Sequence, residues 1–200
     1  TVSIANTQTI NFDELLIPTS QELLRGGVFN FGSRVGILGG TSAGGGNRFD
    51  PGFIALALDN TRNLTGLQVS YDIIKIIEQV NSRNMLVDLQ YTTGNPENTG
   101  TAWNTVPGTT HFTGTLPADT VTRFNNVPLP SIFENRQSPI YLRWYYRTNP
   151  NNGGAGTYDA IAFDNVVISS DSSPNIFLTL SLSPSVISAT GCAHASVGPL

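Results

Sequence analysis

The chain of 200 residues has little charge, one cysteine and one lysine, and these shortages exclude several classes of protein. Charged residues make up 12% of the sequence, about half the share found in an average soluble protein. The net charge is −4 and arginine and lysine form no cluster, which argues against nucleic acids and anionic membrane surfaces as partners. No apolar run approaches the ~18 residues that a membrane-spanning helix needs.

The cysteine and lysine usage also bears on where the protein works. The single cysteine, Cys192, can form no disulfide within the chain, so cysteine usage leaves the compartment open. The segment Cys192-Ala193-His194 is too short a set to ligate zinc. A single lysine, together with turns rich in Thr, Asn and Gly, resembles the composition of bacterial surface and secreted β-proteins. We therefore expect an extracellular location, secreted or at a bacterial cell surface.

What the sequence does contain is a period of two, the pattern of strands with one buried face. The clearest alternating segments are 67–73, 85–91, 140–147 and 161–168, and weaker ones are 2–4, 35–38, 53–58 and 121–124. Residues 73–77 are apolar on both faces, which predicts a doubly covered strand or a bulge. Only residues 20–24 suggest a helix. We predict an all-β fold, a jelly-roll-like antiparallel β-sandwich with extended terminal strands.

The C-terminal segment forms a pattern of its own. We expect residues 1–170 to form the sandwich, and residues 171–200 to hold a linker, an extra apolar strand and a tail. Burial of the apolar residues of this strand releases roughly 1.5–3 kcal/mol each before ordering costs. The strand either folds back on its own sheet or adds to a neighbouring subunit, and residues 1–10 are the other candidate for exchange. The predicted assembly residues are Ile176, Leu178, Leu180 and Leu182.

Several motifs together resemble a known family. They are NLTGLQVSY at 63–71, LVDLQYTT at 86–93, WNTV at 103–106, IYLRW at 140–144 and YDAIAFDNVVI at 158–168. Over residues 11–168 they resemble a jelly-roll module of large secreted bacterial proteins, adhesin-like or similar to carbohydrate-binding modules. The resemblance implies a non-catalytic part of adhesins, exported nucleases or polysaccharide-active enzymes. Residues 178–191 resemble the lead-in strand of a further β-domain.

The resemblance also implies a structural calcium ion. Carbohydrate-binding jelly rolls often hold calcium between an acidic residue of an N-terminal Phe-Asp or Phe-Glu motif and an aspartate of the last strand. Asp13, Glu14 and Asp164 are similar in type and order, and carboxylate oxygens suit this cation. The alternative is that Asp13 and Glu14 open a surface turn while Asp164 accepts backbone hydrogen bonds.

A second candidate site is the row Tyr141, Arg143, Tyr145 and Arg147, which the period of two places on the face away from the core. Two aromatic residues at this spacing make a face about 7 Å long on which sugar rings could stack. The alternatives are a protein interface, in which Tyr and Arg are enriched, and a solvated face held by cation–π contacts.

Catalytic patterns are weak. Residues 40–44 fit the G-x-S-x-G nucleophile elbow, but the glycine-rich segment after them predicts no helix, and the available histidines are His111 and His194. A glycosidase requires two carboxylates that face each other across a cleft. The glutamates at 78, 97 and 134 share no predicted face. We expect no enzyme activity.

The function expected from the sequence is therefore structural or adhesive. We expect an extracellular β-sandwich subunit that joins like subunits by strand donation, forming a filament or surface layer. The alternative is a carbohydrate-binding module of a polysaccharide-active protein, which would use the Tyr/Arg face and could hold a calcium ion. An accessory or degradative domain of an enzyme is a third hypothesis.

Overall fold

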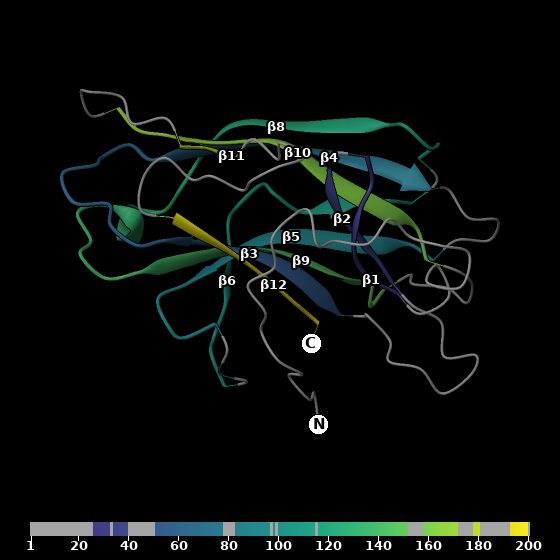
Figure 1. Ribbon diagram of the computed structural model, residues 1–200, viewed down its shortest axis with the longest axis horizontal. Coiled ribbons are helices and arrows are strands. Elements are labelled where there is room, and N and C mark those ends of the chain that lie inside the picture. Colours follow the sequence, from purple (N-terminus) through teal and green to yellow (C-terminus); the bar gives the residue numbers. More distant parts are fainter. Residues whose placement is uncertain are drawn as a thin grey trace.

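The computed structural model describes residues 26–32, 34–39, 51–77, 83–96, 98, 100–114, 116–151, 158–171, 178–180 and 193–199. The regular secondary structure of this part of the chain is nearly all strand, and its strands form two antiparallel sheets on either side of one hydrophobic core (Figure 1). The prediction of an all-β antiparallel sandwich is confirmed. Nowhere in these residues is there a helix long and apolar enough to cross a membrane.

Each sheet has six strands. Sheet 1 consists, in spatial order, of β1 (Gly27–Asn30), β2 (Val35–Leu38), β10 (Ala160–Ser169), β4 (Gln68–Ile77) and β8 (Val121–Pro128), with β11 (Leu178–Leu180) also paired to β10. Sheet 2 consists of β12 (Ala193–Pro199), β3 (Gly52–Leu58), β9 (Ile140–Thr148), β5 (Met85–Thr92) and β6 (Asn104–Thr105), with β7 (His111–Phe112) also paired to β5. The 3-10 turn η2 (Ser131–Phe133) precedes β9.

The core follows the alternation that the sequence predicted. On β9 the inward residues Ile140, Leu142, Trp144 and Tyr146 are each at most 2% exposed. The Trp144 ring lies between the two sheets, with its centroid 5.5 Å from that of Tyr71 on β4 and 5.4 Å from that of Phe163 on β10. Alternate apolar residues thus face inward because successive side chains of a strand point to opposite faces.

The doubly apolar segment at 73–77 carries a bulge. Ala160 of β10 lies opposite Ile77, while the next residue, Ile161, lies opposite Lys75, so β4 has one extra residue at Ile76. Ile74 and Lys75 are also buried. The segment is therefore both covered on two faces and interrupted by a bulge, the two alternatives that the sequence predicted.

The long strands alternate between the sheets along the chain. β2, β4, β8 and β10 belong to sheet 1, and β3, β5 and β9, which come between them in sequence, belong to sheet 2. The strand candidate at 2–4, the helix candidate at 20–24 and the glycine-rich segment at 40–46 lie outside the described residues.

Candidate functional site

Strand β3 has an outer edge that requires a partner strand. All seven of its residues are buried. Ile54, Leu56 and Leu58 join the core, whereas Phe53 and the two alanines between them face the other way. A strand that is apolar on both faces is typical of a sheet interior. One side of β3 pairs with β9, and β12 pairs along the other side over seven residues, from Ala193 opposite Leu58 to Pro199 opposite Gly52.

The predicted assembly strand also pairs within the chain. Leu178 and Leu180 lie in β11 and are opposite Ile168 and Val166 of β10. β2 pairs with the first half of β10 and β11 with the second half, while β4 occupies the other side, so β2 and β11 share one edge of β10. The other two predicted assembly residues, Ile176 and Leu182, lie outside the described residues.

The edge at β8 has the opposite character. Five of its eight residues are exposed, and Arg123 extends to Asp72 of β4, with 3.7 Å between Nε and Oδ1. Asn126 has a φ of 49° within a bulge, and its backbone N–H donates to Ser70 Oγ at 2.8 Å. Charges, bulges and proline are devices by which natural sheets avoid pairing at an edge. Of these two edges, β3 is therefore the one built to be covered.

The row Tyr141, Arg143, Tyr145 and Arg147 lies on the face of sheet 2 away from the core, but it is packed. Arg143 is only 9% exposed. Its guanidinium carbon lies 4.0 Å from the ring centroid of Trp103 and 4.3 Å from that of Tyr145, and Nε donates to Gln90 Oε1 at 2.9 Å. Burial lowers the pKa of Arg143 to about 10.

The second arginine of this row is also engaged within the chain. Arg147 donates to Asp88 Oδ2 at 3.0 Å, and Asp88 accepts a further hydrogen bond from Thr110 Oγ1 at 2.7 Å. The Arg147 guanidinium lies 5.8 Å from the Tyr145 ring, so Tyr145 contacts both arginines of the row. Tyr145 is therefore used in cation–π packing rather than presented as an open platform for a sugar ring.

Calcium receives little support from the geometry. Asp13 and Glu14 lie outside the described residues. Asp164 Oδ2 accepts from Arg34 Nε at 3.1 Å, and Oδ1 accepts from the backbone N–H of Asn165 at 2.8 Å. In the part of the chain that the structure describes, no group of three or more His, Cys, Asp or Glu residues could hold a metal ion. The described residues thus supply one of the three predicted ligands, and calcium remains a prediction.

Several residues of the motifs at 63–71 and 158–168 have structural roles. Asp159 pairs with Lys75, and Asn165, with a φ of 51°, donates from Nδ2 to Asp72 Oδ2 at 2.8 Å. Gly66 has a φ of +58°, and a Cβ built there would lie 2.1 Å from a carboxylate oxygen of Asp171. The motifs therefore specify bulges, turns and ion pairs of the sandwich, which explains why they indicate a fold more than a function.

The two histidines considered as catalytic candidates lie in different strands of sheet 2. His111 lies in β7 with its ring edge-on to Phe124, and burial lowers its pKa to about 4. His194 lies in β12, in a different part of sheet 2. The G-x-S-x-G segment at 40–44 is outside the described residues.

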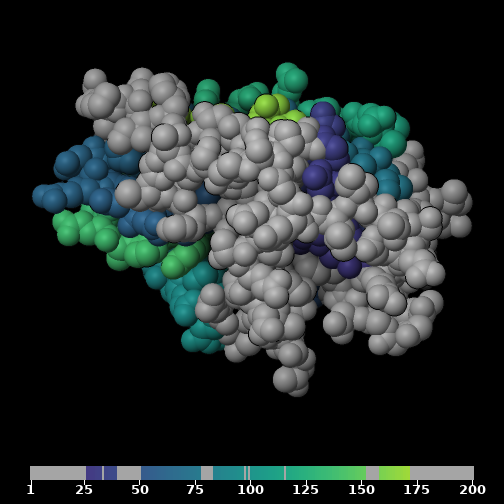
Figure 2. Space-filling model, in the orientation of Figure 1, coloured from purple at the N-terminus to yellow at the C-terminus, as the bar shows by residue number. Residues whose placement is uncertain are grey.

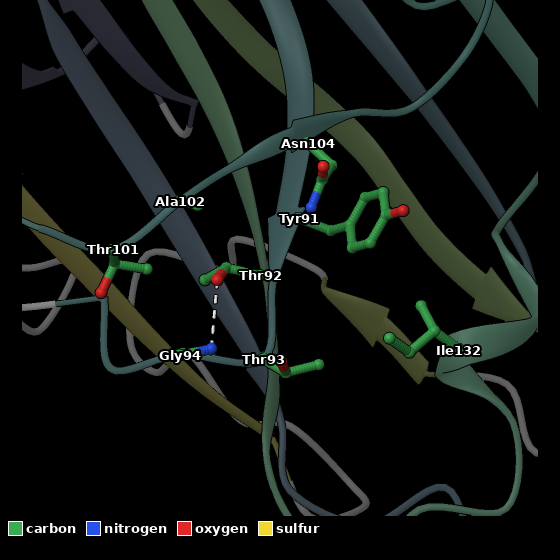
Figure 3. Close-up of a pocket in the computed structure, with 8 residues that line it drawn as sticks. All are labelled: Tyr91, Thr92, Thr93, Gly94, Thr101, Ala102, Asn104 and Ile132. Atoms are coloured by element: carbon green, nitrogen blue, oxygen red, sulfur yellow. Dashed lines mark hydrogen bonds between the residues drawn. The ribbon is translucent and has the colours of Figure 1, made fainter.

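A pocket at one end of the sandwich was not predicted from the sequence. Figure 2 shows at this end the β3–β4 connection in blue beside the chain before β9 in green, where Thr61 N–H donates to the Arg136 carbonyl at 3.0 Å. The pocket, of about 320 Å³, lies between the β5–β6 connection and η2. It is lined by Tyr91, Thr92, Thr93, Gly94, Thr101, Ala102, Asn104 and Ile132 (Figure 3).

A comparison of the chain with protein-family models finds no matching family, and a search of curated proteins finds no significant relative.

Proposed function

We propose that the chain is a structural β-sandwich subunit that assembles with copies of itself through the edge of β3. The observation that carries the proposal is that β3 is apolar on both faces, so its outer edge must be covered by a strand. In a single chain β12 covers this edge. In the assembly that we propose, β12 of one copy covers β3 of the next.

Exchange of this strand preserves its pairing. The same backbone groups pair in the same register whether β12 comes from its own chain or from a neighbour. The twelve residues 181–192 connect β11 to β12 and can extend to about 40 Å, enough to reach an adjacent copy. Head-to-tail exchange of one strand gives an open filament whenever the rotation between copies does not close a ring.

The jelly-roll connectivity and the extracellular, non-catalytic role expected from the sequence fit this proposal. Alternation of successive long strands between two sheets supports a jelly-roll connectivity. The low charge, the single lysine and the resemblance to modules of secreted bacterial proteins support an extracellular, non-catalytic role. Sugar binding through Tyr141 and Tyr145 has weaker support, because the guanidinium of Arg143 packs on Tyr145.

A matched pair of proline variants tests the proposal. Residues of an antiparallel strand alternate between positions that are hydrogen-bonded to the partner strand and positions that are not. Pro199 has no N–H to donate, so it occupies a position of β12 that is not hydrogen-bonded to β3. Ala195, four residues earlier, occupies a position of the same kind. Ser196, opposite Ala55, belongs to the bonded set. Ser196→Pro therefore breaks the ladder, whereas Ala195→Pro is the control.

We expect the full chain to form oligomers in light scattering, Ser196→Pro to reduce them to monomers, and Ala195→Pro to leave them intact. Equal oligomerisation of both variants would contradict a role for β12. A monomeric full chain would contradict the proposal as a whole.

A further inference from the structure

We propose that the pocket beside Tyr91 binds a neutral sugar residue, independently of strand exchange. It is separate from the Tyr141–Arg147 row that the sequence singled out, and it lies at the loop end of the sandwich (Figure 3). Three properties of the pocket support this ligand class: its size, its lack of charge, and its division into an apolar and a hydroxyl-rich side.

The size of the pocket limits the ligand. Its volume of about 320 Å³ is at the lower end of the range of small-molecule sites. One pyranose ring and part of a neighbouring ring fit into such a space, whereas a dinucleotide or a folded peptide does not. A site of this size suits one unit at the end or side of a glycan.

The chemistry of the described lining favours an uncharged ligand. None of the eight described residues that line the pocket is charged. An anion would require arginine or lysine and a cation would require carboxylates, since a charge loses its hydration when it enters a pocket. The polar groups that are present are threonine hydroxyls, the amide of Asn104 and backbone groups, which are partners for neutral hydroxyls.

The pocket has one apolar side. Figure 3 shows the side chains of Tyr91 and Ile132 on the right and those of Thr92 and Thr101 on the left. The Tyr91 ring packs against that of Phe133, with a centroid distance of 5.4 Å. Ile132 is 43% exposed and is one of three large apolar side chains exposed to this degree among the described residues. A pyranose has an apolar C–H face and hydroxyl edges, and so matches both sides.

The hydroxyl-rich side is held in place by its own hydrogen bonds. Gly94 N–H donates to Thr92 Oγ1 at 3.1 Å, and Thr101 Oγ1 donates to the carbonyl of Asn95. Asn98 closes the turn between them, because its N–H donates to the Asn95 carbonyl at 3.1 Å and its own carbonyl accepts from Thr101 at 3.0 Å. A rim ordered before binding loses little conformational entropy when a ligand enters.

Binding is tested with the full chain in native gels that contain mannan, xylan, galactan or starch, with polygalacturonate as a charged counterpart. We expect at least one neutral polysaccharide to retard the protein. Ile132→Ser and Asn104→Ala change exposed residues of the pocket, and each should weaken this binding at least tenfold. Val121→Ser removes an equally exposed apolar side chain outside the pocket and should leave binding unchanged.

No retardation by any neutral polysaccharide, retardation by polygalacturonate alone, or equal binding by Ile132→Ser and the unaltered chain would each overturn the proposal. Light scattering of Ile132→Ser separates this site from strand exchange, because its state of assembly should equal that of the unaltered chain. Thermal unfolding of each variant shows that the fold is retained.

Discussion

The Lys75 ammonium lies 3.2 Å from the Asp159 carboxylate inside the sandwich, where the two side chains are 2% and 0% exposed. Lys75 is the one lysine of the chain, and its Nζ also donates to the Gly114 carbonyl at 3.3 Å. The Tyr146 hydroxyl donates to the main-chain carbonyl of Asp159 at 2.7 Å. The pair therefore joins β4 to the start of β10 and, through Tyr146, to β9 of the other sheet.

Removal of one partner should be costly. A buried charge without its counter-ion destabilises a fold by about 3–5 kcal/mol. We expect Lys75→Met and Asp159→Asn each to lower the free energy of unfolding by an amount of this order in urea denaturation. The double variant Lys75→Met/Asp159→Leu should lose less than the sum of the two, since it leaves no buried charge. A single variant within about 1 kcal/mol of the unaltered protein would contradict this account of the pair.

Arg143 should be irreplaceable by lysine. An ammonium group cannot present the flat guanidinium that packs between Trp103 and Tyr145. We expect Arg143→Lys to lower the free energy of unfolding by about 1–2 kcal/mol, from loss of the cation–π contacts and of the bond to Gln90. The exposed Arg62→Lys is the control and should have no effect. Equal stability of the two variants would indicate that this packing contributes nothing.

His111 should make the fold less stable in mild acid. Burial lowers its pKa to about 4 from the ordinary 6.5, so between these values the unfolded chain binds more protons than the folded one. The contribution of the neutral His111 to the free energy of unfolding is complete above pH 6.5 and is lost as the pH falls toward 4. We expect His111→Gln to retain about 1–3 kcal/mol more of its neutral-pH stability at pH 4.5 than the unaltered chain does. Parallel pH profiles of the two proteins would contradict this.

The sequence predicted what depends on local pattern. The inward alternation of β9 and β4 and the bulge beside Lys75 were foreseen, because the period of two reports burial directly. Contacts between residues distant in the chain were not foreseen, because they depend on the register in which the strands pair. Asp159 faces Lys75 only because β10 pairs with β4 at this register. Arg143 is buried because Trp103, from a distant connection, covers it.

The pocket was missed for a similar reason. Nothing in the sequence of residues 92–100 indicates that Ile132 of η2 lies across the pocket from Tyr91. The exposure of Ile132, which distinguishes it among the apolar residues of the described part, becomes apparent only in the structure. The extra C-terminal strand could be predicted from its local alternation. Its pairing with the edge of β10 could not, because that edge is formed only by the folded sheet.

β11 provides a further test of assembly through the C-terminal segment. We expect Leu178→Asp with Leu180→Asp to disrupt the pairing of β11 with β10, because charges replace apolar residues in a sheet, and to abolish oligomers as well if exchange of β12 needs β11 anchored on its own sandwich. Thr179→Asp, at the intervening position, is the control. Retention in polysaccharide gels should be the same for the double variant, the Thr179→Asp control and the unaltered chain. Normal assembly of the double variant would show that β11 takes no part.

The measurement that tests the central claim most directly is the mass of the native particle, by light scattering together with negative-stain microscopy. The account predicts oligomers or filaments that Ser196→Pro reduces to monomers and Ala195→Pro leaves intact. A particle of 21.4 kDa at every concentration would contradict it, and would show that β12 covers β3 only within its own chain.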